Sequence, residues 1–119
     1  MTAEQFQKEA HTFSQYPFPF LNESKDVSRE LNYIYPALGL AEEAGEVAGK
    51  YAKAVRDENG FISLQRKEEI KKELGDVLWF VAELSTQLGL TLSEVMQCNI
   101  DKLSSRKARG VIGGSGDNR

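Results

Sequence analysis

The segment of residues 65–88 constrains the fold most, because it is apolar around nearly its whole circumference when drawn as a helix. Its apolar members are Leu74, Val77, Leu78, Trp79, Phe80, Val81, Ala82 and Leu84. A helix with almost no polar side is buried, so we expect other helices to cover this one. Trp79 and Phe80 are expected in that core, since aromatic residues in an apolar helix usually serve packing rather than ligand stacking.

Three further helices are predicted from apolar residues at helical spacing. They span residues 3–14, 30–55 and 91–107. In the second, Pro36 predicts an ordered start, because proline is tolerated in a first turn. Thr91 and Glu94 form a capping box for the last helix, and Gly89 ends the helix before it. No stretch alternates with a period of two residues, so the sequence predicts an all-α fold.

The chain of 119 residues is long enough for one domain and too short for two ordinary ones. We expect one helical domain over residues 1–109, with its core at residues 30–109. Residues 110–119 contain four glycines and are expected to form a flexible tail. The proline-rich residues 16–20 are expected to break the first helix and pack over the bundle.

Charge and composition exclude several classes of function. The net charge of −3 argues against broad binding of nucleic acid or of an acidic membrane. The single Cys98 cannot form an internal disulfide, and no apolar run reaches the roughly 20 residues of a membrane span. Residues 1–5 lack the basic start of a signal peptide. We therefore expect a soluble cytoplasmic protein with a reduced thiol.

Two short acidic pairs repeat thirty residues apart. Glu43 and Glu46 flank Gly45, and Glu73 and Asp76 flank Gly75. Residues three apart share a helix face, so each pair can present two carboxylates to one cation. Glycine costs roughly 1 kcal/mol inside a helix, so the two glycines predict that another backbone or a ligand comes close.

The two pairs differ in the strength of their signal. On a helical wheel Glu43 and Glu46 lie roughly 100° and 160° from an apolar stripe, and alone they predict a solvated surface. That stripe consists of Ala37, Ala41, Ala44, Ala48 and Tyr51. Glu73 and Asp76 belong to the apolar helix and cannot easily reach water, so each needs a partner.

A divalent cation resolves the repulsion among four carboxylates on two antiparallel helices better than flexible lysines do. Pairing with Lys71 and Lys72 is the main competing account. His11 and Cys98 lie away from the pairs, so the ligands are all oxygen, which favours Mg²⁺ or Mn²⁺ over zinc. A di-iron bundle is disfavoured because it needs Glu-x-x-His motifs.

At these residues the chain resembles the MazG-like family of the all-α nucleoside triphosphate pyrophosphohydrolase superfamily. The family signature of two glutamates, a third after a gap of two, and a distant Glu-x-x-Asp stands here as Glu42, Glu43, Glu46, Glu73 and Asp76. Flanking residues 39–41 and 74–82, and an element at residues 99–106, are similar to the family's as well. The resemblance covers roughly residues 30–109.

The resemblance implies a four- to five-helix bundle completed by a homodimer or a dimer of dimers. It also implies Mg²⁺-dependent hydrolysis of a nucleoside triphosphate between the α and β phosphates, giving the monophosphate and pyrophosphate. The chemistry is consistent with this, because an acidic site can hold a triphosphate only through bridging metal ions.

The acidic residues receive separate expected roles. Glu46, Glu73 and Asp76 are expected to bind the metal. Glu43 is expected to be a further ligand, or the base that takes the proton of the attacking water. Glu42 is expected to support catalysis or to bind a second metal ion.

Basic and amide side chains are candidates for substrate binding. Lys102 and Arg106, one turn apart in the last helix, are expected to contact phosphate oxygens, and Asn99 the sugar or a phosphate. Ordinary positive charge at a helix C-terminus explains the two basic residues equally well. Lys50 and Lys53 are alternatives for the phosphate role.

Two other functions remain open at this point. A non-enzymatic helical dimer would place the acids on a solvated or partner-facing surface. Phosphoribosyl-ATP pyrophosphohydrolase activity would use the same metal chemistry on another base and sugar. Neither the preferred nucleotide nor the number of metal ions follows from the sequence.

Overall fold

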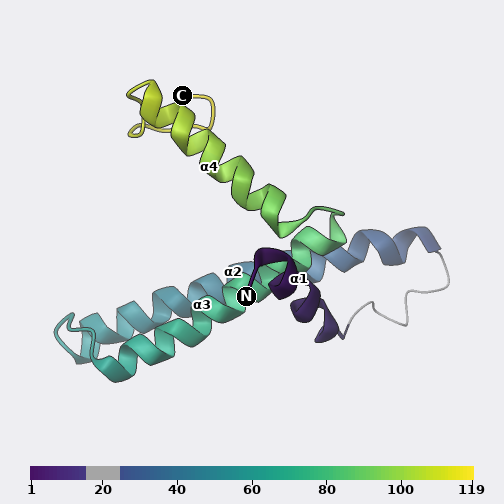
Figure 1. Ribbon diagram of the computed structural model, residues 1–119. Helices are drawn as coiled ribbons and strands as arrows, with labels where there is room; N and C mark the ends of the chain where they lie inside the picture. Colours follow the sequence, from purple (N-terminus) through teal and green to yellow (C-terminus); the bar gives the residue numbers. More distant parts are fainter. Residues whose placement is uncertain (16–24) are drawn as a thin grey trace.

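A computed structural model describes residues 1–15 and 25–119, with the side chains of residues 1–15 and 34–119. These residues form four helices (Figure 1): α1 at Ala3–Thr12, α2 at Lys25–Asp57, α3 at Leu64–Gln87 and α4 at Leu92–Ala108. No strand occurs among the described residues, which confirms the predicted all-α class. The predicted packing of residues 16–20 lies outside the described part.

The predicted end signals act at three helix ends. Thr91 Oγ1 accepts from the backbone N–H of Glu94, and the Glu94 carboxylate accepts from that of Thr91, which completes the capping box of α4. Gly89 follows Leu88, the C-cap residue of α3, and has a φ of 71°. Asn59 and Gly60 have positive φ in the turn between α2 and α3, as the sequence predicts.

The expected start of the second helix was wrong, because α2 begins eleven residues before Pro36 and contains it. An internal proline removes one backbone hydrogen bond and favours a kink. Here the Pro36 side chain is fully buried, and the neighbouring Tyr35 ring packs on Phe80 with centroids 5.8 Å apart. Tertiary packing thus compensates for a local signal that ends most helices.

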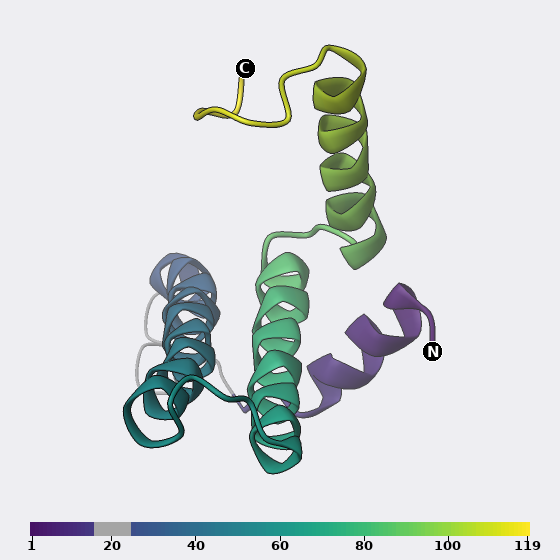
Figure 2. The same cartoon turned by 90° about the vertical axis from the view of Figure 1, so that its left-hand side faces the viewer.

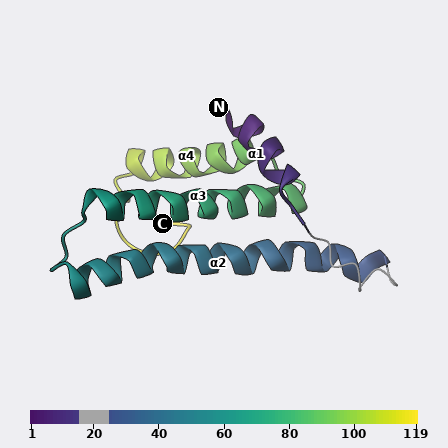
Figure 3. The ribbon, with the colours of Figure 1, turned by 90° about the horizontal axis from the view of Figure 1, so that it is seen from below.

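Helices α2 and α3 form a long antiparallel hairpin (Figure 3). The buried and half-buried residues among the described side chains of α2 are Pro36, Gly39, Leu40, Glu43, Val47, Gly49, Lys50 and Ala54. The alanine stripe of the helical wheel instead faces away from α3, since all five of its residues are exposed. The wheel therefore identified the wrong side of α2 as the one that meets α3.

One glycine permits the close approach of the two helices. A Cβ added at Gly39 would overlap the Phe80 ring, so only glycine fits there. The close approach expected at Gly45 and Gly75 is absent, because a Cβ at either meets nothing within 4 Å among the described residues. Of these three helical glycines, Gly39 is the one whose cost in helix stability is explained by packing within this chain.

Helix α1 crosses α3 and packs on its C-terminal half (Figures 1 and 3). Ala10, Ala82 and Leu92 form the buried cluster at this crossing, and Trp79 packs against it. The Trp79 indole Nε1 donates to the carbonyl oxygen of Ala10 at 3.0 Å. The core role expected for Trp79 is confirmed, and so is that of Phe80, which is 8% exposed.

Helix α4 extends away from the hairpin, so the chain is not a compact bundle (Figures 1 and 2). The radius of gyration is 17.8 Å, against about 13 Å for a compact domain of this length. Leu74 and Leu78 of α3 are 48% and 53% exposed. The expectation that other helices bury α3 on all sides is therefore wrong within one chain. No described helix is long and apolar enough to cross a membrane.

Replacing Gly39 by alanine is expected to lower the free energy of unfolding by about 1–3 kcal/mol, because the added methyl group overlaps the Phe80 ring. Urea denaturation followed by circular dichroism measures this. Gly49→Ala is the matched control, since its Cβ meets nothing within 4 Å and alanine favours the helix. Equal stability of both variants would contradict the close packing.

Candidate metal centre

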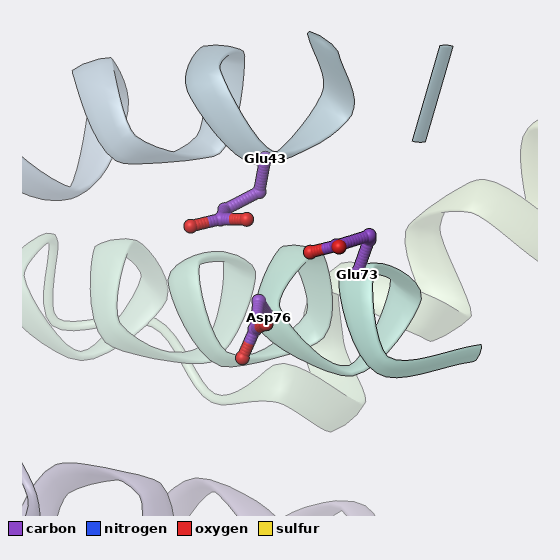
Figure 4. A group of neighbouring side chains, drawn as sticks. All are labelled: Glu43, Glu73 and Asp76. Atoms are coloured by element: carbon purple, nitrogen blue, oxygen red, sulfur yellow. The ribbon is translucent and has the colours of Figure 1, made fainter. Parts of the chain in front are cut away.

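Three carboxylates meet between α2 and α3. Glu43 projects from α2 toward Glu73 and Asp76 on α3 (Figure 4), and one oxygen of each lies within 4.8 Å of the others. Glu43 and Glu73 are half-buried, while Asp76 is exposed. The structure thus brings together three of the four carboxylates that the sequence predicted as metal ligands.

The hairpin positions these side chains by its register. Gly39 and Phe80 pack on one side of the carboxylates along the hairpin, and Ala54 and Ile70 are buried toward the other end. Positions between such layers in a helix pair are normally apolar. Glu43 and Glu73 therefore occupy core-like positions, with packed layers on either side along the hairpin, while Asp76 lies at the exposed edge.

The charges of the cluster repel one another. Burial raises the pKa of Glu43 above its ordinary value, and the negative charges of Asp76, Glu42, Glu73 and Glu46 raise it further. Glu43 therefore favours its charged form less than an isolated carboxylate does. A bound cation would remove this cost, so the electrostatics favour cation binding.

One lysine already reaches the cluster. Lys50 Nζ lies 2.9 Å from Glu73 Oε1, with both side chains 18% exposed, and hydrogen bonding to Glu73 raises the lysine's pKa. Lys71, expected as a competing partner, instead pairs with Glu68 at 3.1 Å. One ammonium group offsets one of three carboxylates, so ionised side chains leave a net negative site for a divalent ion.

The remaining acidic candidates lie at the edge of the cluster. Glu42 and Glu46 are exposed and do not belong to the group of three. Both still raise the pKa of Glu43, so they lie within electrostatic reach. Their expected roles in catalysis and metal binding stay predictions.

The α4 candidates do not meet the acids within one chain. Asn99 and Lys102 are exposed on α4, which diverges from the hairpin (Figure 1). Arg106 is buried, and both basic side chains bond to Asp117 in the tail. Contact between these α4 side chains and a phosphate held at the acids would therefore require the hairpin of a second chain. For Lys102 and Arg106 it would also require displacement of the tail.

The sequence analysis missed one buried charge. Glu83 is 0% exposed, and its Oε1 lies 2.9 Å from His11 Nδ1, which joins α1 to α3. The signal was present in the sequence, since Glu83 is the only acid in the apolar run of residues 77–84. His11 therefore lies apart from the acidic cluster, as expected, but serves a specific polar contact.

Comparison with known proteins assigns the chain to a family. The model of the MazG nucleotide pyrophosphohydrolase domain matches residues 35–111, which include the hairpin carboxylates and α4. The chain belongs to the MazG family. Activity of the nucleotide pyrophosphohydrolase type follows from this membership, while the nucleotide does not.

Two relatives illustrate the extent of the match. Gene 37 protein of Mycobacterium phage L5 is 53% identical over 85 residues, which cover 71% of this chain and 75% of the relative. Uncharacterized protein YvdC of Bacillus subtilis is 36% identical over 76 residues, which cover 56% of this chain and 68% of the relative. No solved structure gives a significant match.

The donor set of this MazG-family chain fits a hard divalent cation. The group contains carboxylate oxygens only, and neither histidine nor cysteine belongs to it. Such ligands suit Mg²⁺ or Mn²⁺, whereas zinc favours nitrogen and sulfur. Glu43, Glu73 and Asp76 are the residues that would hold the ion.

Replacing Lys50 by methionine is expected to tighten Mg²⁺ binding by about fivefold, because a unit charge a few ångströms from the ion costs about 1 kcal/mol even in water. Titration calorimetry with Mg²⁺ measures the dissociation constant. Lys53→Met removes the same charge from an exposed neighbouring turn and serves as the control. Equal effects of both variants would show that only net charge matters.

Proposed function

We propose that this MazG-family chain hydrolyses a nucleoside triphosphate between its α and β phosphates with Mg²⁺ as cofactor. The observation that carries the proposal is the group of Glu43, Glu73 and Asp76 across the α2–α3 hairpin. These residues lie within residues 35–111, the part of the chain that matches the MazG nucleotide pyrophosphohydrolase domain. The products would be the nucleoside monophosphate and pyrophosphate.

The proposed chemistry divides between the ion and the side chains. Bound Mg²⁺ supplies positive charge that neutralises the phosphates and polarises water. Glu73 and Asp76 hold the ion, and Glu43 faces them from the opposite helix. Because burial raises its pKa, Glu43 accepts a proton more readily than an exposed carboxylate does.

The reaction balances with water as the only other reactant. The water oxygen forms a new bond to phosphorus while its proton passes to the Glu43 carboxylate. The bond between phosphorus and the oxygen that bridges the α and β phosphates breaks. Lys50, which pairs with Glu73 at 2.9 Å, orients that carboxylate and offers its ammonium group to a phosphate oxygen.

A second copy of the chain is the proposed partner. The chain exposes 8742 Å², whereas a compact monomer of 13.3 kDa exposes about 6,500 Å². The excess of about 2,200 Å² for one chain lies in the range that an obligate dimer buries, which is about 1,000–2,500 Å² per partner. It includes an apolar face of α4 formed by Met96, Ile100 and Leu103. Dimerisation would also bring the α2–α3 hairpin of one chain close to α4 of the other. The α4 side chains that would face it are Asn99, Lys102 and Arg106.

Variants of the three carboxylates test the proposed activity. Asp76→Asn and Glu43→Gln are each expected to lower turnover at least about 100-fold, through loss of a ligand and of the base. Glu46→Gln is expected to lose about tenfold, because Glu46 lies outside the group of three. Circular dichroism checks that helix content is retained.

The assay follows pyrophosphate and orthophosphate separately, with a panel of nucleoside triphosphates and phosphoribosyl-ATP. Pyrophosphate release that requires Mg²⁺ supports the proposal. Orthophosphate as the sole product would refute the cleavage position. Loss of folding in all variants would assign the acids a structural role instead.

Replacing Ile100 by glutamate is expected to convert the dimer into a monomer, because it places a charge in the apolar face of α4. Gel filtration with light scattering measures the mass. Ser105→Glu, an exposed position on the opposite side of the same helix, is the control and should remain a dimer. A monomeric wild-type protein would contradict the proposed interface.

A further inference from the structure

The tail beyond α4 folds back onto two basic side chains. Figure 1 shows it looping round the end of α4. The Arg106 guanidinium donates through one nitrogen to the Asp117 carboxylate at 3.1 Å and to the carbonyl oxygens of Gly116 and Asp117 at 3.3 and 3.0 Å. Lys102 Nζ lies 3.5 Å from the same Asp117 carboxylate oxygen.

The start of the tail is fixed by the end of the helix. Gly110, with a φ of 70°, donates its N–H to the carbonyl oxygen of Lys107, and Val111 donates to that of Arg106. Gly116 also has a positive φ of 83°, directly before Asp117. These are conformations that glycine adopts without strain. The glycines therefore direct the tail back toward α4.

Lys102 and Arg106 form an anion site in which one hydrogen-bond donor of Arg106 is unpaired among the described residues. The Arg106 side chain is 6% exposed, yet its buried Nε has no hydrogen-bond partner among the described residues. A buried guanidinium nitrogen without an acceptor costs free energy, and a larger anion with several oxygens would satisfy it. The present anionic partner of Arg106 is the Asp117 carboxylate. This side chain is 82% exposed, so water competes with Arg106 for it.

We propose that Asp117 occupies a phosphate site formed by Lys102 and Arg106, so that the tail competes with the phosphates of the substrate. The carboxylate imitates a phosphate oxygen, and the tail keeps it at high local concentration because it is part of the same chain. The inference rests on the proposed function for the identity of the competing ligand. The tail thereby sets how readily the site accepts a substrate.

Both Arg106 and Lys102 affect the ionisation of Asp117. Hydrogen bonding to Arg106 lowers the pKa of Asp117 below its ordinary value, and the charge of Lys102 lowers it further. Asp117 is therefore ionised at neutral pH. The competition should persist throughout the pH range in which a nucleotide hydrolase is assayed.

The test compares Asp117→Asn with wild type in the full chain, with inorganic pyrophosphate as the probe in titration calorimetry. If the tail covers the site in most molecules, the variant should bind pyrophosphate about three- to tenfold more tightly. The KM for the triphosphate should fall by the same factor while kcat is unchanged. Asp101→Asn, the same charge change on the exposed surface of α4, is the control and should leave binding unchanged.

A second variant identifies the site through which the tail acts. Lys102→Met should weaken pyrophosphate binding and reduce the gain that Asp117→Asn gives in the same chain. Trypsin supplies a readout without activity, since pyrophosphate should displace the tail and speed cleavage after the exposed Arg109. Faster cleavage in Asp117→Asn without any ligand would further support the competition.

The outcomes separate this inference from the proposed function. Unchanged pyrophosphate binding in Asp117→Asn, or an equal gain in Asp101→Asn, overturns the competition even where triphosphate hydrolysis is intact. Tighter pyrophosphate binding and faster trypsin cleavage in Asp117→Asn support it, even if no triphosphate is hydrolysed. In that last case the proposed activity fails and the anion site remains.

Discussion

Like-charge repulsion between α2 and α3 is the constraint on which the rest of the structure depends. Glu43 and Glu73 occupy positions of a helix pair that apolar residues normally fill, and Asp76 adds a third charge at the edge. Such a cluster weakens the hairpin unless a cation reaches it. Packing must therefore hold the helices together on both sides of the charges.

The packing that opposes this repulsion is concentrated at the end of the hairpin near α1. Gly39 lets Phe80 approach α2 closely, and the Phe80 ring meets Trp79 edge-on with centroids 4.8 Å apart. Trp79 in turn bonds to α1, and the buried Glu83 bonds to His11 beside it. Helix α1 therefore stabilises the part of α3 that follows the metal ligands. The repulsion among the carboxylates is thus offset by dense packing in the neighbouring part of the hairpin. Such an arrangement is expected where residues needed for a function lower stability.

Helix patterns and end signals made much of the fold predictable. Local signals suffice where the chain needs only its neighbours, so the capping box at Thr91 and the stop at Gly89 act as expected. They failed at Pro36, because burial against α3 compensates for the hydrogen bond that proline removes. The helical wheel failed on α2, because it ranks hydrophobicity and the alanines it grouped face away from α3. The acidic spacing, by contrast, picked out three carboxylates that the hairpin does bring together, since it depends on which residues share a helix face.

The sequence alone determined the all-α class, the acidic signature and an oxygen-only ligand set, because these depend on residue type and spacing along single helices. Tertiary structure decided which carboxylates meet, because hairpin register places Glu43 beside Glu73 and leaves Glu46 outside. It also decided that Lys50 reaches the cluster, and that Asp117 covers the basic pair of α4. These contacts join residues on different segments, and their distances depend on how helices and tail pack rather than on local pattern. Spacing thus identifies the candidate residues, and packing decides which of them meet.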